Sequence, residues 1–119
     1  MQSAVFDLVG QHAIEKGLPW HFLFTRYTKP SKTPVDLTGL AARMEIFDAL
    51  TPGAPIHTLS SADGDIVLGG VAGTVDIDLS GAASAAFTAK HLRYRLFFIS
   101  GGVDSLYMRG RLGLTEGDV

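Results

Sequence analysis

The 119-residue chain contains no cysteine. Disulfide bonds, thiolate metal ligands and thiol nucleophiles are therefore excluded. A strong charge of one sign is also missing, because ten basic and twelve acidic residues give a formal net charge of −2. Such a chain has no overall positive field that would attract nucleic acid or anionic lipid. We therefore predict that neither nucleic acid nor a membrane is its partner.

Long apolar runs are absent as well. A membrane-spanning helix needs about 18 or more consecutive apolar residues, and no stretch of this sequence approaches that length. Residues 1–7 also lack the basic start and the continuous apolar run of a secretory signal. We expect a protein that is made in the cytoplasm and is used there or in a viral particle assembled there.

The sequence is rich in apolar residues that alternate with polar ones. Apolar residues account for 46% of the chain and charged residues for 18%, a balance that indicates one folded domain spanning residues 1–119. The alternation and the 14 glycines, most of them between short apolar runs, predict an all-β fold. Turn signals recur roughly every 8–12 residues, which is typical of a sandwich or a barrel. The expected strands are residues 4–9, 12–15, 20–27, 41–48, 56–59, 66–68, 74–79, 91–100 and 105–114.

One segment departs from the strand pattern. Residues 80–88 are rich in alanine and begin with Ser80, a residue type that commonly caps the N-terminus of a helix. We predict one short helical crossover there.

The last two expected strands form a hairpin whose register follows from the alternation. Side chains alternate between the two faces of a strand, and the apolar residues of both strands have even numbers. These apolar residues share one face of the hairpin only if the numbers of two paired residues add up to an even number. A three-residue loop at residues 101–103 satisfies this condition and supplies glycine for a left-handed position. A two-residue turn at Gly101-Gly102 would bury arginine instead. The predicted pairs are Phe98 with Leu106, Leu96 with Met108, Tyr94 with Gly110, and Leu92 with Leu112.

The same register predicts a candidate protein interface on the outer face of the hairpin. It places Arg95 opposite Arg109, Arg93 opposite Arg111, and Phe97 opposite Tyr107. Like charges directly opposite cost a few tenths to about 1 kcal/mol per pair. The face is therefore either a solvated, salt-bridged surface or a docking surface with Phe97 and Tyr107 as apolar anchors. In the first case, the carboxylates that would neutralise the face are those of Glu45, Asp76 and Asp78.

No motif in the sequence predicts a catalytic or cofactor site. Nucleophilic catalysis has no support, because none of the serines lies in a Gly-x-Ser-x-Gly motif. Residues 69–73 are glycine-rich but lack the lysine and the following helix of a phosphate-binding loop. Asp76 and Asp78 share one strand face about 7 Å apart, a spacing that a glycosidase could use, but a charge partner on the strand explains them better. We predict no enzyme activity and no cofactor.

No metal site is predicted either. Asp63-Gly64-Asp65 lacks the remaining acidic positions of a calcium loop. The histidines show no metal-ligand spacing, so only convergence in space could bring them to a metal. They are His12, His21, His57 and His91.

Several segments of the chain, taken in order, resemble small structural proteins of tailed bacteriophages. The most informative segment is Pro34-Val35-Asp36-Leu37-Thr38-Gly39, a turn signal that runs directly into the alternating strand ending in Arg43-Met44-Glu45-Ile46. The other segments are Gly17 with Trp20 and Phe22, residues 63–68, residues 73–80, Phe87-Thr88-Ala89, and Tyr94-Arg95-Leu96 with its hairpin. Together they look like an immunoglobulin-like module, similar to the N-terminal domain of phage baseplate upper proteins. The family pattern has aspartate after the tyrosine, so Arg95 departs from it.

The resemblance covers roughly residues 5–115 and implies a fold and a role. The implied fold is an immunoglobulin-like antiparallel β-sandwich of about 7–9 strands. The implied role is that of a non-catalytic virion structural protein in the tail, baseplate or fibre attachment region, which docks other virion proteins in a homo-oligomeric ring. Such a ring uses two distinct surface patches, and the loop at residues 28–37, with Lys29 and Lys32, is the expected second one. Alternatives are a capsid decoration protein, a head–tail joining (neck) protein, and a carbohydrate-binding β-sandwich module.

Overall fold

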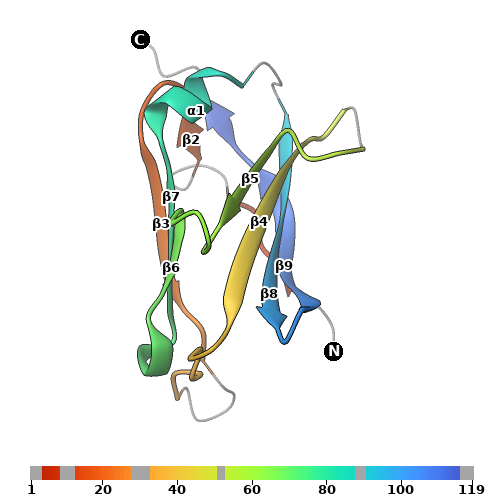
Figure 1. Cartoon of the computed structure of the whole chain (residues 1–119). Coiled ribbons are helices and arrows are strands. Elements are labelled where there is room, and N and C mark those ends of the chain that lie inside the picture. The colour runs from red at the N-terminus through yellow and green to blue at the C-terminus, as the bar shows by residue number, and fades with distance from the viewer. Residues whose placement is uncertain (1–3, 9–12, 28–32, 51–52, 88–90, 116–119) are drawn as a thin grey trace.

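The protein is a sandwich of two β-sheets, seen in a computed structural model that describes residues 4–8, 13–27, 33–50, 53–87 and 91–115 (Figure 1). In chain order the elements are β1 (Ala4–Val5), β2 (Ile14–Glu15), β3 (Trp20–Thr25), β4 (Ala41–Asp48), β5 (His57–Ser60), β6 (Ile66–Leu68), a 3-10 turn (Gly70–Ala72), β7 (Thr74–Leu79), α1 (Gly81–Ala85), β8 (Leu92–Ser100), β9 (Val103–Leu112) and β10 (Leu114–Thr115). The larger sheet has the strand order β1-β9-β8-β4-β5, and the smaller one has the order β3-β7-β6.

This strand order is that of an immunoglobulin-like sandwich. In such folds strands B, E and D form one sheet, and strands G, F, C and C′ form the other. Here β3, β7 and β6 take the places of B, E and D, while β9, β8, β4 and β5 take those of G, F, C and C′. The main pairs are antiparallel, whereas β1 runs parallel to β9 and β2 runs parallel to β10. The predicted all-β sandwich of about 7–9 strands is confirmed, since the two sheets of the described residues hold eight strands.

The core lies between the two sheets because each central strand alternates buried and exposed residues. In β8, Leu92, Tyr94 and Leu96 are buried while the arginines between them are exposed. The smaller sheet contributes the buried face of β3 and β7 from the opposite side. Trp20 belongs to this set and is buried at 6% exposure.

The helix begins and ends close to where the sequence predicts it. Ser80 caps α1, since its side-chain oxygen accepts a hydrogen bond from the Ala83 amide at 3.1 Å. The buried Ser84 hydroxyl accepts a hydrogen bond from the Gly17 amide at 2.9 Å, which fixes α1 against the turn after β2 (Figure 1). With only five residues, α1 is much too short to cross a membrane, and no helix in the described part of the chain has the length and hydropathy to do so.

The β8–β9 hairpin corrects one prediction. The pairs Leu92–Leu112, Tyr94–Gly110 and Leu96–Met108 are as predicted, but Phe97 pairs with Leu106 and Phe98 with Ser105. The turn is therefore the two-residue Gly101-Gly102, with φ values of 57° and 82° that suit a tight hairpin turn. A β-bulge at Tyr107 supplies the extra residue, so the arginines still face outward. The predicted three-residue loop holds only for a regular ladder, which has no bulge.

The N-terminal segment is held closely against β9 and β8. The Phe6 amide donates to the Arg109 carbonyl and the Leu8 amide to the Arg111 carbonyl, both at 2.8 Å. The buried Tyr94 hydroxyl also donates to the Phe6 carbonyl. Gly110 permits this approach, because a Cβ atom on it would lie 2.4 Å from the Phe6 carbonyl oxygen.

Candidate functional site

The four hairpin arginines predicted as interface residues line one pocket on the outer face of the larger sheet. Arg93 and Arg95 come from β8, and Arg109 and Arg111 from β9; all four are exposed. The pocket has a volume of about 780 Å³. Its other lining residues are Asp7, Phe47, Asp48, Ala49, Gly53, Tyr94 and Gly110. We call this surface the arginine pocket.

Arg111 is neutralised by the N-terminal segment. Its guanidinium donates from Nε at 3.2 Å and from a terminal nitrogen at 3.0 Å to Asp7 Oδ2, and its amide donates to Asp7 Oδ1 at 3.0 Å. These hydrogen bonds, first the backbone one and then those of the side chain, lower the pKa of Asp7 below its ordinary value. The positive charge of Arg93 lowers it further. Asp7 therefore stays ionised and holds Arg111 at the edge of the pocket.

Arg95 is partly neutralised from β4. It donates to Glu45 Oε1 at 3.3 Å, and its guanidinium lies 4.6 Å from the centre of the Phe47 ring. Glu45 also accepts from Arg43 at 3.1 Å, and Arg43 in turn donates to Asp104 at 2.8 Å. The expectation that Glu45 offsets this charge is confirmed, whereas Asp76 and Asp78 lie in the other sheet and do not contribute.

Arg93 and Arg109 have no such partner among the described residues. Across the described ranges of the chain, neither side chain has an acidic group within ion-pair distance. Asp48 also lines the pocket, but its Oδ1 accepts a hydrogen bond from the Leu50 amide at 2.9 Å. Four arginines against two aspartates leave the lining with a net charge of +2. Guanidinium groups bind carboxylates and phosphates with directed, paired hydrogen bonds, so the pocket is suited to an anionic group.

The two aromatic residues predicted as anchors do not lie together on this face. The bulge turns Tyr107 toward the core, where its ring stacks on Phe24 with a centroid distance of 6.2 Å. Arg26 lies 4.5 Å from the centre of the same ring. Phe97 stays on the outer face, half-buried, with the Arg43 guanidinium 4.5 Å from its ring centre. The predicted pairing of Phe97 with Tyr107 is therefore wrong, and neither residue lines the pocket.

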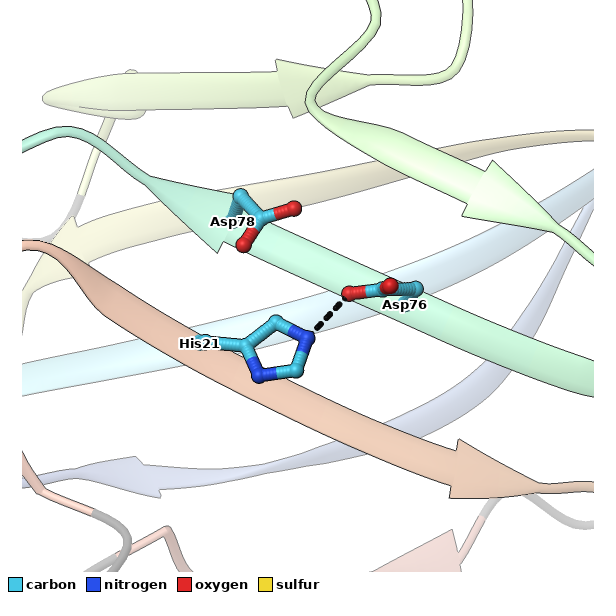
Figure 2. Close-up of side chains that lie close together, drawn as sticks. All are labelled: His21, Asp76 and Asp78. Atoms are coloured by element: carbon cyan, nitrogen blue, oxygen red, sulfur yellow. Dashed lines mark hydrogen bonds and ion pairs between the residues drawn. The ribbon is translucent and has the colours of Figure 1, made fainter.

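A second cluster of polar groups lies on the outer face of the smaller sheet. His21 of β3 and Asp76 and Asp78 of β7 place one potential metal-ligand atom each within 4.8 Å of one another (Figure 2). His57 and His91 are not part of any such group in the chain as described. Of the other residues considered from the sequence, His12, Lys29 and Lys32 lie outside the described residues.

Comparison with protein-family models and with curated proteins finds no match.

The arginines of the pocket are predictable from the sequence, but the residues that form its other walls are not. Asp7 reaches the site because β1 and the residues after it run parallel to β9, and Phe47 and Asp48 reach it from the end of β4. One signal was available, since a glycine within a strand, such as Gly110, often marks the close approach of another backbone segment. The pattern does not say which segment approaches.

Proposed function

We propose that this protein is a non-catalytic assembly module of a tailed-bacteriophage particle that docks another virion protein through the arginine pocket. One observation carries the docking part of the proposal: Arg93 and Arg109 are exposed and lack an acidic partner in the part of the chain described by the structure. The phage assignment is supported by the order of sequence segments that resemble phage structural modules and by an immunoglobulin-like sandwich of the kind that this resemblance implies.

The partner's contact group should be acidic. Arg95 faces Arg109 and Arg93 faces Arg111 in the hairpin register, so each pair of positions carries like charges. Such pairs cost a few tenths to about 1 kcal/mol each when nothing offsets them. Asp7 and Glu45 offset one member of each pair. An aspartate or glutamate of the partner would offset Arg93 and Arg109, and the aromatic ring of Phe47 gives the pocket an apolar wall for the rest of that side chain.

The sequence resemblance to baseplate proteins favours tail assembly, in which copies of one module form a ring and hold larger components. Capsid decoration and head–tail joining use the same kind of surface and differ in copy number and symmetry. A carbohydrate-binding role is less well supported, because it needs an exposed aromatic platform and the single tryptophan, Trp20, is buried.

The first test is quantitative mass spectrometry of particles purified from the source phage. A copy number equal to a small multiple of the tail symmetry supports the tail assignment, whereas hundreds of copies support capsid decoration. Absence of the protein from particles would overturn the virion role.

Charge reversal tests the docking surface separately. Arg93→Glu and Arg109→Glu should leave the monomer folded but prevent its incorporation into particles. The matched control is Lys16→Glu, which changes the net charge equally at a turn between β2 and β3 and does not line the pocket. Normal incorporation of both arginine variants would show that the pocket is not the docking surface.

A further inference from the structure

The smaller sheet holds three metal-binding side chains in one row on its outer face. In the β3–β7 register His21 lies directly opposite Asp78, and Asp76 follows two positions away on the same face of β7. His21 Nε2 lies 2.5 Å from Asp76 Oδ1, and the Asp78 carboxylate points toward the same space (Figure 2). The three side chains therefore converge from two strands that are adjacent in space but far apart in sequence.

We propose that His21, Asp76 and Asp78 bind a divalent first-row transition metal, with Zn²⁺ as the best-fitting ion. An imidazole nitrogen and two carboxylate oxygens form a mixed donor set that suits Zn²⁺, Mn²⁺ or Co²⁺, whereas Ca²⁺ and Mg²⁺ prefer oxygen donors alone. The two carboxylates also balance the charge of a divalent ion. Zinc takes ligand atoms at about 2.0–2.2 Å, so small rotations of side chains whose ligand atoms already lie within 4.8 Å of one another would complete the site.

The backbone beneath the cluster is well fixed. β7 is the central strand of the sheet and pairs with β3 on one side and β6 on the other. The opposite faces of these strands carry the buried residues Phe22, Val75 and Ile77, which pack in the core. Metal binding therefore requires only changes of side-chain rotamer. Because the backbone is already ordered, the loss of conformational entropy on binding is small.

The negative charge of the cluster is offset only in part by the described residues. His21 hydrogen-bonds Asp76, but among the described residues no group hydrogen-bonds or pairs with the Asp78 carboxylate. A metal ion would bind this carboxylate and take the place of the hydrogen bond between His21 and Asp76. Because His21 and Asp76 are solvent-accessible, with side-chain exposures of 54% and 38%, an ion can reach the site directly.

Three protein ligands leave part of the coordination sphere of zinc open. Structural zinc sites normally have four protein ligands, while sites with three keep a position for water or another ligand. Leu23 and Val67 flank Asp76 on the two neighbouring strands and are both more than half exposed. The site thus lies within a partly apolar surface, on the sheet opposite the arginine pocket.

Titration of the full chain with Zn²⁺, followed by calorimetry, tests this site. The wild-type protein should bind one equivalent, and Co²⁺ should give the visible absorption of a coordinated ion. His21→Gln and Asp78→Asn should each weaken binding about tenfold or more, since even indirect partners of metal ligands are worth about 10–100-fold in affinity. The matched control is His91→Gln, which removes an exposed histidine outside the cluster and should leave binding unchanged.

Thermal unfolding provides an independent measurement. A metal that binds the folded state raises the melting temperature, so zinc should raise it for the wild-type protein and for His91→Gln but not for His21→Gln. Circular dichroism without metal checks that the His21 and Asp78 variants are folded. The proposal is overturned if zinc does not bind, if His21→Gln binds as tightly as the wild type, or if Ca²⁺ binds in preference to Zn²⁺. These outcomes do not depend on the proposed phage role.

Discussion

Replacing Gly110 with alanine should destabilise the protein by forcing the N-terminal segment away from β9. The added Cβ atom would lie 2.4 Å from the Phe6 carbonyl oxygen, 2.8 Å from the Phe6 carbonyl carbon and 2.9 Å from Asp7 Oδ1. Two of these atoms belong to the backbone, so rotation of a side chain cannot relieve the clash. Either the segment shifts by a fraction of an ångström or it detaches.

The magnitudes favour the shift. Detachment would break the backbone hydrogen bonds from the Phe6, Leu8 and Gly113 amides and the one from the Tyr94 hydroxyl. At roughly 0.5–1.5 kcal/mol each, these amount to about 2–6 kcal/mol, and exposing the buried Leu8 adds about 1.5–3 kcal/mol. Overpacking with a local shift typically costs about 1–3 kcal/mol. We therefore expect Gly110→Ala to lower the free energy of unfolding by about 1–3 kcal/mol.

Urea denaturation measures this change, and amide hydrogen exchange locates it. The amides of Phe6 and Leu8 should exchange faster in Gly110→Ala, because their hydrogen bonds to Arg109 and Arg111 are weakened. Ser105→Ala, at an exposed position of the same strand, is the control and should change stability by less than about 0.5 kcal/mol. Unchanged stability together with unchanged exchange at Phe6 would refute the close approach of the two segments.

Two further predictions concern the hairpin and the pH dependence of the pocket. Leu96→Ala and Met108→Ala should each cost about 2–5 kcal/mol in chemical denaturation because both side chains are buried; near-neutral effects would contradict the observed register. Since the pKa of Asp7 is lowered in the folded state, its contact with Arg111 stabilises the protein above the ordinary aspartate pKa and is lost as the pH falls through the lowered value. The wild-type protein should therefore be more stable than Asp7→Asn near neutral pH, and the difference should shrink between about pH 5 and pH 2 in denaturation midpoints; a constant difference would contradict this account.

Local sequence patterns predicted the elements that depend on neighbouring residues. The strands β4, β6 and β7 begin and end at the predicted residues. In each of them, apolar and polar residues alternate between two turn signals, and this pattern predicts both the strand and its buried face. Ser80 marked the start of α1 for the same local reason. The hairpin was predicted only in part, because a β-bulge changes the register without changing the apolar pattern on which the prediction rested.

At the two candidate sites, contacts within one hairpin are predictable from the sequence, whereas contacts between distant segments are not. The arginines of the pocket could be named because they share one hairpin, and pairing across a hairpin follows from its alternation. Asp7 joins them through a parallel contact between residues more than 100 positions apart, and His21 meets Asp76 across 55 positions. No local sequence pattern predicts either contact, because the pairing of distant strands depends on how the whole core packs.

The sequence by itself determined that the chain is all-β, where most strands lie, which of their faces are buried, and that four arginines share the outer face of the last hairpin. Only the tertiary structure decided that the N-terminal segment closes one side of the arginine pocket, that Tyr107 turns inward, and that His21 joins two aspartates. The physical reason is that alternation and turn chemistry act over a few residues, whereas strand order and distant contacts depend on the free energy of burying the complete core.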